Sequence, residues 1–549
     1  MKRVKEQIKY LALLAICLLS GCSDFLDSYN PSAVTDDFYN TKEGQQKLLT
    51  DINARYRNVF NTGELQYYGT DIYMAISEEP AERMFNGYDK TFNSTAPIVG
   101  DYWKVLYKIV QESNILLNRC TPDIAGSDYT SLTAQARFFR AMAYYYLVET
   151  FGPVPLLTEE NTSVIQQAER TGEQAIYTFI ITELNDIKDK LDMTTISAGK
   201  VTNAAVIHFL GKMYLTRAYK SFAETDDFSN AATTFDLLVE NPASGYALQE
   251  NYAALFDENN QANSEVIWAI QYGLDKNYRG DGNPQQAQFG FNIVALEPDL
   301  FIKNQNDYSS VSRKYWVNPK AHELYTDPEA DTRYDATFKR EYYINNPDNA
   351  DYGKLGIYFP RWNDKSGMSN NAKRFYPFKQ DDEYVWYPQS TALPVLETAS
   401  DRMPMVRKFS DTKIQWGEGG SREDVIFRLG DTYLLCAEAY LGAGNKKLAL
   451  ERINSIRKRA AKDATAYEAM KLTDLDINVI MDERARELMG EHDRWFDLKR
   501  TQTLLTRVPA YNPFVVKYDN LNKNHLVRPI PQDERNKVDG LSLIHISEP

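Results

Sequence analysis

The stretch "AYLGAGNKKLALERINSIR" at 439–457 carries the clearest structural signal in the chain. Apolar residues recur at helical spacing on both sides of "GAGN", and glycine is a common residue at the end of a helix. The residues at packing positions are Ala439, Tyr440, Gly444, Ala449 and Leu450. Because small side chains let two antiparallel helices approach closely, this stretch predicts a tight helical hairpin.

A second, looser copy of the pattern lies upstream. Its members are Leu210, Gly211 and Tyr214 on a first predicted helix and Ala231 and Phe235 on a second. Both copies have the residue offsets of a tetratricopeptide hairpin. Two degenerate copies predict a short superhelical scaffold and not a long solenoid.

Most of the chain outside its middle is predicted to be helical. The apolar spacing is helical at 101–117, 132–150, 173–191, 202–219 and 231–239, and again at 425–441, 446–460 and 475–500. Breaker stretches such as "FGPVPLL" separate these segments. The predicted fold class is therefore mainly α.

The middle of the chain has a different composition. Of the 121 residues at 270–390, 23 are Phe, Trp or Tyr, which is about 19% against 13% in the whole chain. They are mixed with Asn, Asp, Gly and Pro and have little helical period. This composition predicts an irregular, loop-rich region with short strands, and loops of this length inside a compact chain are usually functional.

The N-terminus is typical of a bacterial lipoprotein. Four basic residues precede an apolar run of about a dozen residues, which is too short to span a membrane. Leu19-Ser20-Gly21-Cys22 has the form of a lipobox, so residues 1–21 are predicted to be a signal peptide and Cys22 the lipidated residue. Residues 22–40 are then a tether to the membrane.

Net charge and cysteine content argue against a nucleic-acid-binding protein and against a disulfide-rich fold. Removal of four basic residues and one acidic residue with the signal lowers the formal net charge from −14 to −17. This balance argues against a nucleic-acid partner, whose binding depends on Lys and Arg. Only Cys120 and Cys436 remain as free thiols, which is too few for a disulfide framework.

Six stretches, taken in order, resemble the SusD/RagB family of Bacteroidetes outer-membrane lipoproteins. They are "DYWKVLYKIVQESNILLNR", "AQARFFRAMAYYYLVETFGPVPLL", "RLGDTYLLCAEAYLGAGN", "RINSIRKRA", "RARELMGEHDRWFDLKR" and "RPIPQDE". The resemblance implies a SusD-like fold, with tetratricopeptide-like hairpins as a scaffold. It implies an N-terminal helical domain at 41–270 and a C-terminal domain at 271–540, with the aromatic loop region at 271–420.

The resemblance also implies a function. Such proteins capture a nutrient, usually a glycan, at the cell surface and act as a lid on a SusC-like TonB-dependent transporter. No catalysis and no cofactor or metal are implied. The last residues, 541–549, depart from the family pattern and resemble translated adapter sequence, so we expect them to be a non-native tail.

Glycan contacts are expected on loops, because a Trp or Tyr ring covers the apolar face of a sugar while polar side chains meet its hydroxyls. Two stretches have this composition. The first contains Tyr68, Tyr73, Arg83, Phe85 and Asn86, and the second contains Tyr278, Arg279, Asn283, Trp316, Trp362 and Trp386. The helix residues Trp103, Tyr107 and Asn114, and the thiol of Cys436, are assigned to packing instead.

Three alternatives to glycan capture remain open. A related lid that captures peptides has the same architecture. A glycoside hydrolase needs two facing carboxylates, and 76 acidic residues give no support for any particular pair. A pure interaction scaffold would bind no small ligand at all.

The cluster Glu491-His492-Asp493 has residue types that also occur in metal and acid–base sites. No second histidine stands at the spacing of a zinc-binding helix, and the surrounding charges alternate with apolar residues. The pattern favours a helix whose charges pair as it packs.

Overall fold

The structure of the chain is a computed structural model that describes residues 36–541, apart from 76–79, 90–91, 164, 195–198, 291–292, 304–313, 360, 363–377, 381–382 and 386–403. The predicted signal peptide, Cys22, Trp386 and residues 542–549 lie outside the described residues. Of the predicted tether, residues 36–40 form the 3-10 helix η2 (Asp36–Asn40).

The fold is mainly α, as predicted. The helices of the first half are α2 (Lys42–Phe60), α3 (Pro80–Asn86), α4 (Pro97–Arg119), α5 (Pro122–Ala125), α6 (Tyr129–Phe151), α7 (Glu173–Ile187), α8 (Asn203–Arg217), α9 (Asp227–Phe235) and α10 (Tyr252–Leu255). The short helices of the middle are α11 (Lys276–Arg279), α12 (Gln285–Phe289), α13 (Ile293–Leu296), α14 (Pro319–Glu323) and α15 (Arg333–Thr337).

The last part of the chain is again helical. Its helices are α17 (Leu429–Gly442), α18 (Lys446–Ala460), α19 (Ala464–Met470), α20 (Ile477–Glu487), α21 (Arg494–Arg500), α22 (Leu504–Tyr511), α23 (Pro513–Tyr518) and α24 (Gln532–Lys537). Single 3-10 turns are η3 (Gly63–Leu65), η4 (Gly126–Asp128), η5 (Pro242–Ser244) and η8 (Lys523–Leu526).

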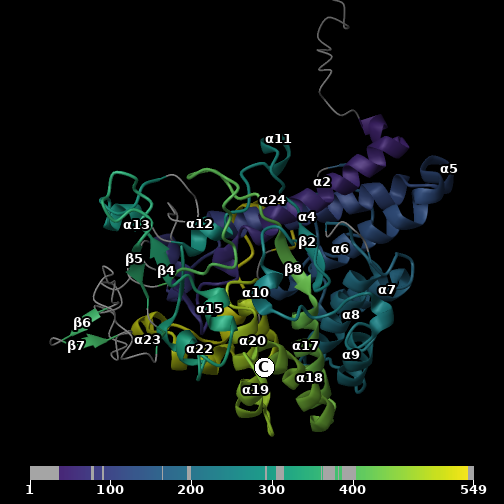
Figure 1. Cartoon of the computed structure of the whole chain (residues 1–549). Coiled ribbons are helices and arrows are strands. Elements are labelled where there is room, and N and C mark those ends of the chain that lie inside the picture. Colours follow the sequence, from purple (N-terminus) through teal and green to yellow (C-terminus); the bar gives the residue numbers. More distant parts are fainter. Residues whose placement is uncertain are drawn as a thin grey trace, which may run out of the picture.

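The larger helices stack in a row. Each of α6, α7, α8 and α9 packs on the next, α9 packs on α17, and α17 packs on α18. Figure 1 shows α7, α8 and α9 beside α17 and α18 on one side of the molecule. The contact between α9 and α17 joins hairpins that are separated by almost 200 residues into one scaffold.

The two predicted tetratricopeptide hairpins are confirmed as α8–α9 and α17–α18. In the first, a Cβ added at Gly211 would lie 2.5 Å from the ring of Phe235, so only glycine fits. In the second, Gly444 turns the chain at φ +79° and the Asn445 side chain accepts a hydrogen bond from the Leu448 amide. Local sequence chemistry therefore sets where these helices turn and how closely they pack.

Short antiparallel strand pairs form within the middle region, as its composition predicts, and also join it to segments on either side. β1 (Tyr73–Ala75) pairs with β3 (Tyr315–Val317), β2 (Val266–Ile270) with β8 (Asp424–Arg428), β4 (Glu341–Tyr343) with β5 (Leu355–Tyr358), and β6 (Phe378–Gln380) with β7 (Glu383–Val385). In Figure 1, β4, β5 and α13 lie on the opposite side of the molecule from α7–α9.

The loop-rich side has a small hydrophobic core of its own. Its buried members are Met74, Ile293, Leu300, Phe301, Trp316, Tyr342, Ile344, Ile357, Phe359, Met405 and Phe514. Several of the aromatic residues in this region therefore hold loops together. Within the described residues, no helix combines the length and the apolar character that a membrane span requires.

Candidate ligand-binding surface

The structure brings the two predicted aromatic stretches together. Strand β1 from the first stretch pairs with β3 from the second, with Tyr73 opposite Val317 and Met74 opposite Trp316. The hydroxyl of Tyr68 donates to the carbonyl of Lys314 at 2.9 Å. Segments about 240 residues apart in the sequence thus pack together on the loop-rich side.

Most of the predicted residues in the first stretch are buried. Tyr68 and Tyr73 are fully buried, and the Tyr73 hydroxyl accepts a hydrogen bond from the Gly490 amide at 2.5 Å. Phe85 and Asn86 are 1% exposed. Arg83 is half-buried, and its Nε donates to Asp89 at 2.8 Å. Of these five residues, Arg83 is therefore the most accessible to a ligand.

The second stretch places Tyr278, Arg279 and Asn283 on one surface turn. The Tyr278 ring is 76% exposed, whereas Arg279 is buried and pairs with Glu418 at 3.1 Å. The backbone of Asn283 exchanges hydrogen bonds with Gly420. The turn is fixed further by Arg57, whose Nη1 donates to the Tyr278 carbonyl at 2.9 Å.

The predicted tryptophans have different surroundings. Trp316 is 7% exposed and belongs to the core of the loop-rich side. Trp362 is half-buried, and its Nε1 donates to the Tyr325 carbonyl at 2.9 Å. Trp386 lies outside the described residues. Contact between a glycan and any of the eleven residues stays a prediction, and Tyr278 offers the most accessible ring among those described.

The sequence reasoning missed a tryptophan next to this turn. Trp416 is half-buried, and the Nζ of Lys303 lies 4.3 Å from the centre of its ring. Glu418, two residues later, pairs with both Lys276 and Arg279. The run "QWGEGG" at 415–420 could have identified Trp416 as a loop aromatic, because it places a single Trp among glycines.

The residues assigned to packing on α4 do pack. The Trp103 ring lies 5.0 Å from Phe151, and the Tyr107 hydroxyl donates to the Pro155 carbonyl at 2.8 Å. The Asn114 side-chain amide donates to the carbonyls of Leu157 and Glu159. Trp103, Tyr107 and Leu157 also line a surface groove of about 500 Å³, whose walls are mostly apolar.

The cluster Glu491-His492-Asp493 is structural, as predicted. Glu491 pairs with Lys408 at 2.9 Å and with Arg428 at 2.6 Å. His492 Nε2 lies 2.8 Å from Asp424, and Asp493 pairs with Lys212 at 2.5 Å. Within the part of the chain that the structure describes, no group of His, Cys, Asp and Glu has an arrangement that would hold a metal ion.

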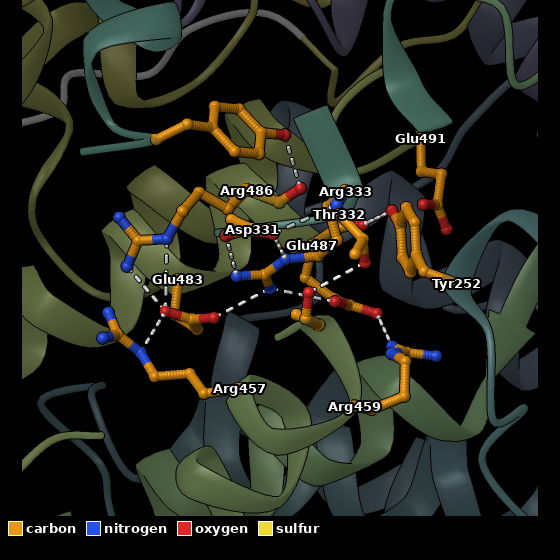
Figure 2. Close-up of polar contacts among 12 residues, drawn as sticks. Tyr252, Asp331, Thr332, Arg333, Arg457, Arg459, Glu483, Arg486, Glu487 and Glu491 are labelled. Atoms are coloured by element: carbon orange, nitrogen blue, oxygen red, sulfur yellow. Dashed lines mark hydrogen bonds and ion pairs between the residues drawn. The ribbon is translucent and has the colours of Figure 1, made fainter. Parts of the chain in front are cut away.

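These contacts extend into a buried charge network, shown in Figure 2. Arg333 on α15 pairs with Asp331, Glu483 and Glu487, at 2.7, 2.8 and 3.1 Å. Burial would raise the pKa of the Glu487 carboxyl, but the guanidinium groups of Arg459, Arg428 and Arg333 lower it to about 2. The network therefore stays charged at neutral pH and fixes the loop-rich side to α18 and α20.

These features define the class of the protein: a helical-repeat scaffold that carries an irregular, aromatic-rich region with no metal cluster among the described residues. The family model described as "SusD family" matches residues 264–544, and one described as "Starch-binding associating with outer membrane" matches residues 24–215. The chain belongs to the SusD family.

Three similar proteins illustrate the relationship. The chain is 24% identical to SusD-like protein P25 of Formosa agariphila, over 97% of this chain and 96% of the relative. It is 26% identical to the starch-binding protein SusD of Bacteroides thetaiotaomicron, over 73% and 69% of the two chains. A solved laminarin-binding SusD-like protein has the same fold, with a TM-score of 0.65, 23% identity and coverage of 91% and 98%.

Proposed function

We propose that this protein captures oligosaccharides at the outer membrane. The proposal is supported by membership in the SusD family and by relatives whose names state starch binding and laminarin binding. The described residues also present an aromatic ring on a rigid turn at the surface, which is the type of contact that sugars use.

The observation that carries the proposal is the position of Tyr278. Its ring is 76% exposed, although large aromatic side chains usually bury most of their surface. Its backbone is held by Arg57, and the neighbouring Arg279 is held by Glu418. A rigid, exposed ring loses little conformational entropy when a sugar stacks on it.

Calorimetry with the protein from Ser23 to Pro549, which retains every described residue, tests the proposal. The titrants are oligosaccharides of starch, laminarin and xyloglucan. We expect binding of at least one, and about a tenfold loss of affinity in Tyr278→Ala, since an aromatic contact is worth about 1 kcal/mol or more. Tyr352→Ala is the matched control, because Tyr352 is also exposed, at 61%. Binding of peptides and of no glycan would support the peptide-capturing alternative instead.

The same proposal includes an anchor and a partner. Lipidation of Cys22 would hold the protein on the outer membrane, and a SusC-like TonB-dependent transporter would receive the glycan. Cys22→Ala is expected to move the protein from the membrane fraction to the soluble fraction. Co-purification with the transporter encoded nearby tests the partner, and a transporter that purifies without this protein would contradict it.

We also propose that the protein binds without catalysis. Glu491, the most prominent carboxylate of the sequence cluster, is committed to Lys408 and Arg428. Incubation with the bound polysaccharide should release no new reducing ends. Release that one carboxylate substitution abolishes would overturn this part of the proposal.

A further inference from the structure

A surface groove of about 540 Å³ lies on the loop-rich side, between the segment from α15 to β4 and the segment at 407–412. Its walls include Asp335, Arg340, Glu341, Tyr343, Arg407 and Ser410. None of these residues is among the eleven candidate contact residues that the sequence analysis selected. The volume lies within the range of about 300 to 1,000 Å³ that is typical of small-ligand sites.

The groove is preformed by the backbone. The Lys339 amide donates to the Met405 carbonyl at 2.9 Å, and the Arg407 amide donates to the Thr337 carbonyl at 2.7 Å. Phe338 and Val406 form an antiparallel bridge between the same two segments. Because its walls are joined by these hydrogen bonds, a ligand would not have to order them on binding.

Basic side chains line the groove, although the chain has a formal net charge of −14. Three basic side chains line it, Lys339, Arg340 and Arg407, against the carboxylates of Asp335 and Glu341. The Asp335 carboxylate is neutralised twice, by Arg340 at 2.6 Å and by Arg361 at 2.5 Å. Arg340 is thus used within the protein, and the exposed guanidinium of Arg407 is the part of the walls that favours an anionic ligand.

Arg407 is the group available to such a ligand. Its side chain is exposed, and among the described residues its guanidinium has neither a hydrogen bond nor an ion pair. By contrast, Arg340 is committed to the Phe359 carbonyl, the Tyr358 hydroxyl and Asp335. A free guanidinium presents a planar set of donors that matches a carboxylate or a sulfate.

Tyr343 supplies a surface for a sugar ring. It is 45% exposed, while its neighbour Tyr342 is fully buried. The Tyr343 hydroxyl donates to Glu341 at 2.9 Å, which limits the rotation of the ring. The Glu341 carboxylate and the Ser410 hydroxyl, both in the groove walls, offer polar contacts for sugar hydroxyls.

We propose that this groove binds the acidic residues of an oligosaccharide, with a carboxylate or sulfate group on Arg407 and a sugar face on Tyr343. This inference rests on the proposed glycan capture and names the class of glycan. It places acid recognition on the side of the loop region that carries β4 and β5, apart from the turn of Tyr278.

Calorimetry with three oligosaccharides of equal length tests the inference: a galacturonate, a sulfated galactan and a neutral glucan. We expect at least one acidic oligosaccharide to bind more tightly than the neutral one, and salt to weaken its binding. Arg407→Gln should reduce that affinity about tenfold or more, since it removes the charge-assisted hydrogen bonds to the acid group. Tyr343→Ala should also reduce it, by about tenfold.

Two control variants match these changes. Lys447→Gln removes an exposed positive charge on α18, and Tyr352→Ala removes an exposed tyrosine near the turn of the β4–β5 hairpin; neither residue lines the groove. Both should bind acidic oligosaccharides as the unmodified protein does. Comparison of the galacturonate with the sulfated galactan identifies whether the groove recognises a carboxylate or a sulfate group.

Different outcomes separate this inference from the proposed function. Binding of neutral glycans in a Tyr278-dependent manner, with no binding of either acidic oligosaccharide, would overturn only the groove proposal. Equal affinity of the unmodified protein and Arg407→Gln for the acidic oligosaccharides would also overturn it. Failure to bind any glycan would overturn the proposed function together with this inference.

Discussion

The buried charge network and the surface groove use the same residue types in opposite ways. In the network, Arg428 is 1% exposed and pairs with Glu265, Glu487 and Glu491. In the groove, Arg407 is exposed and has no such partner among the described residues. An arginine whose donors are all used holds helices in place, whereas one with free donors is available to a ligand. Substitutions should therefore separate stability from binding.

The largest expected effect on stability is that of Glu487→Gln. The change removes a buried negative charge that Arg333, Arg428 and Arg459 share. Breaking a buried ion pair typically costs about 3–5 kcal/mol in the free energy of unfolding, which denaturant titration measures. Glu341→Gln, at an exposed carboxylate, is the control. A loss below about 1 kcal/mol would mean that the network contributes little.

His208 provides a pH test of the buried scaffold. Burial lowers its pKa from about 6.5 to about 4, against the opposing effect of Asp431. The unfolded chain therefore takes up a proton at a higher pH than the folded chain does. The free energy of unfolding should be constant above pH 6.5 with respect to this group and should fall between pH 6.5 and 4.

The variant His208→Gln isolates this contribution. It keeps His492, whose pKa is raised, so the difference between the two pH profiles reports His208 alone. The slope between pH 6.5 and 4 should be shallower in the variant than in the unmodified protein. Parallel profiles across this range would exclude the assignment.

A smaller effect is expected for Gly211→Ala in the α8–α9 hairpin. The added methyl group would meet the Phe235 ring at 2.5 Å, and overpacking of this kind costs about 1–3 kcal/mol. Gly126→Ala is not a suitable control, because Gly126 has φ +58°. Gly172→Ala is suitable, since nothing lies within 4 Å of an added Cβ there. Equal stability of the two variants would show that the hairpin can relax.

The smallest effect on stability is expected for Arg407→Gln. Its side chain makes no ion pair within the described residues, and surface changes of this kind usually stay within about 0.5 kcal/mol. Thermal unfolding should therefore be unchanged while the affinity for acidic oligosaccharides falls about tenfold or more. A marked loss of stability would show that Arg407 belongs to the scaffold and not to a site.

The helical scaffold was predictable from the sequence because its determinants are local. Gly211 and Phe235 stand at the offsets of one hairpin, and Gly444 and Asn445 terminate one helix and begin the next. These contacts join residues that are close in the sequence, so spacing alone identifies them. The structural character of Glu491, His492 and Asp493 was also readable from the alternation of charged and apolar residues.

The exposure of the aromatic residues was not predictable in the same way. Tyr68 and Tyr73 have the composition of a surface loop, yet the pairing of β1 with a strand about 240 residues away covers them. Tyr342 and Tyr343 are adjacent in the sequence, yet one is buried and the other is 45% exposed, because side chains alternate along β4. Composition therefore identified the region but not which rings face solvent.

The pairing of β2 with β8 has a consequence for how such a protein diversifies. Ile270 lies opposite Asp424, so the chain leaves the scaffold and returns to it at neighbouring positions. The 153 residues between them form one long connection whose two ends are held together by this strand pair. Each doubling of such a loop costs only about 0.6 kcal/mol in closure entropy. Insertions, deletions and substitutions at exposed positions between residues 271 and 423 can therefore accumulate and alter ligand preference. Buried members of the charge network, such as Arg333, and the helices that they contact would keep their packing.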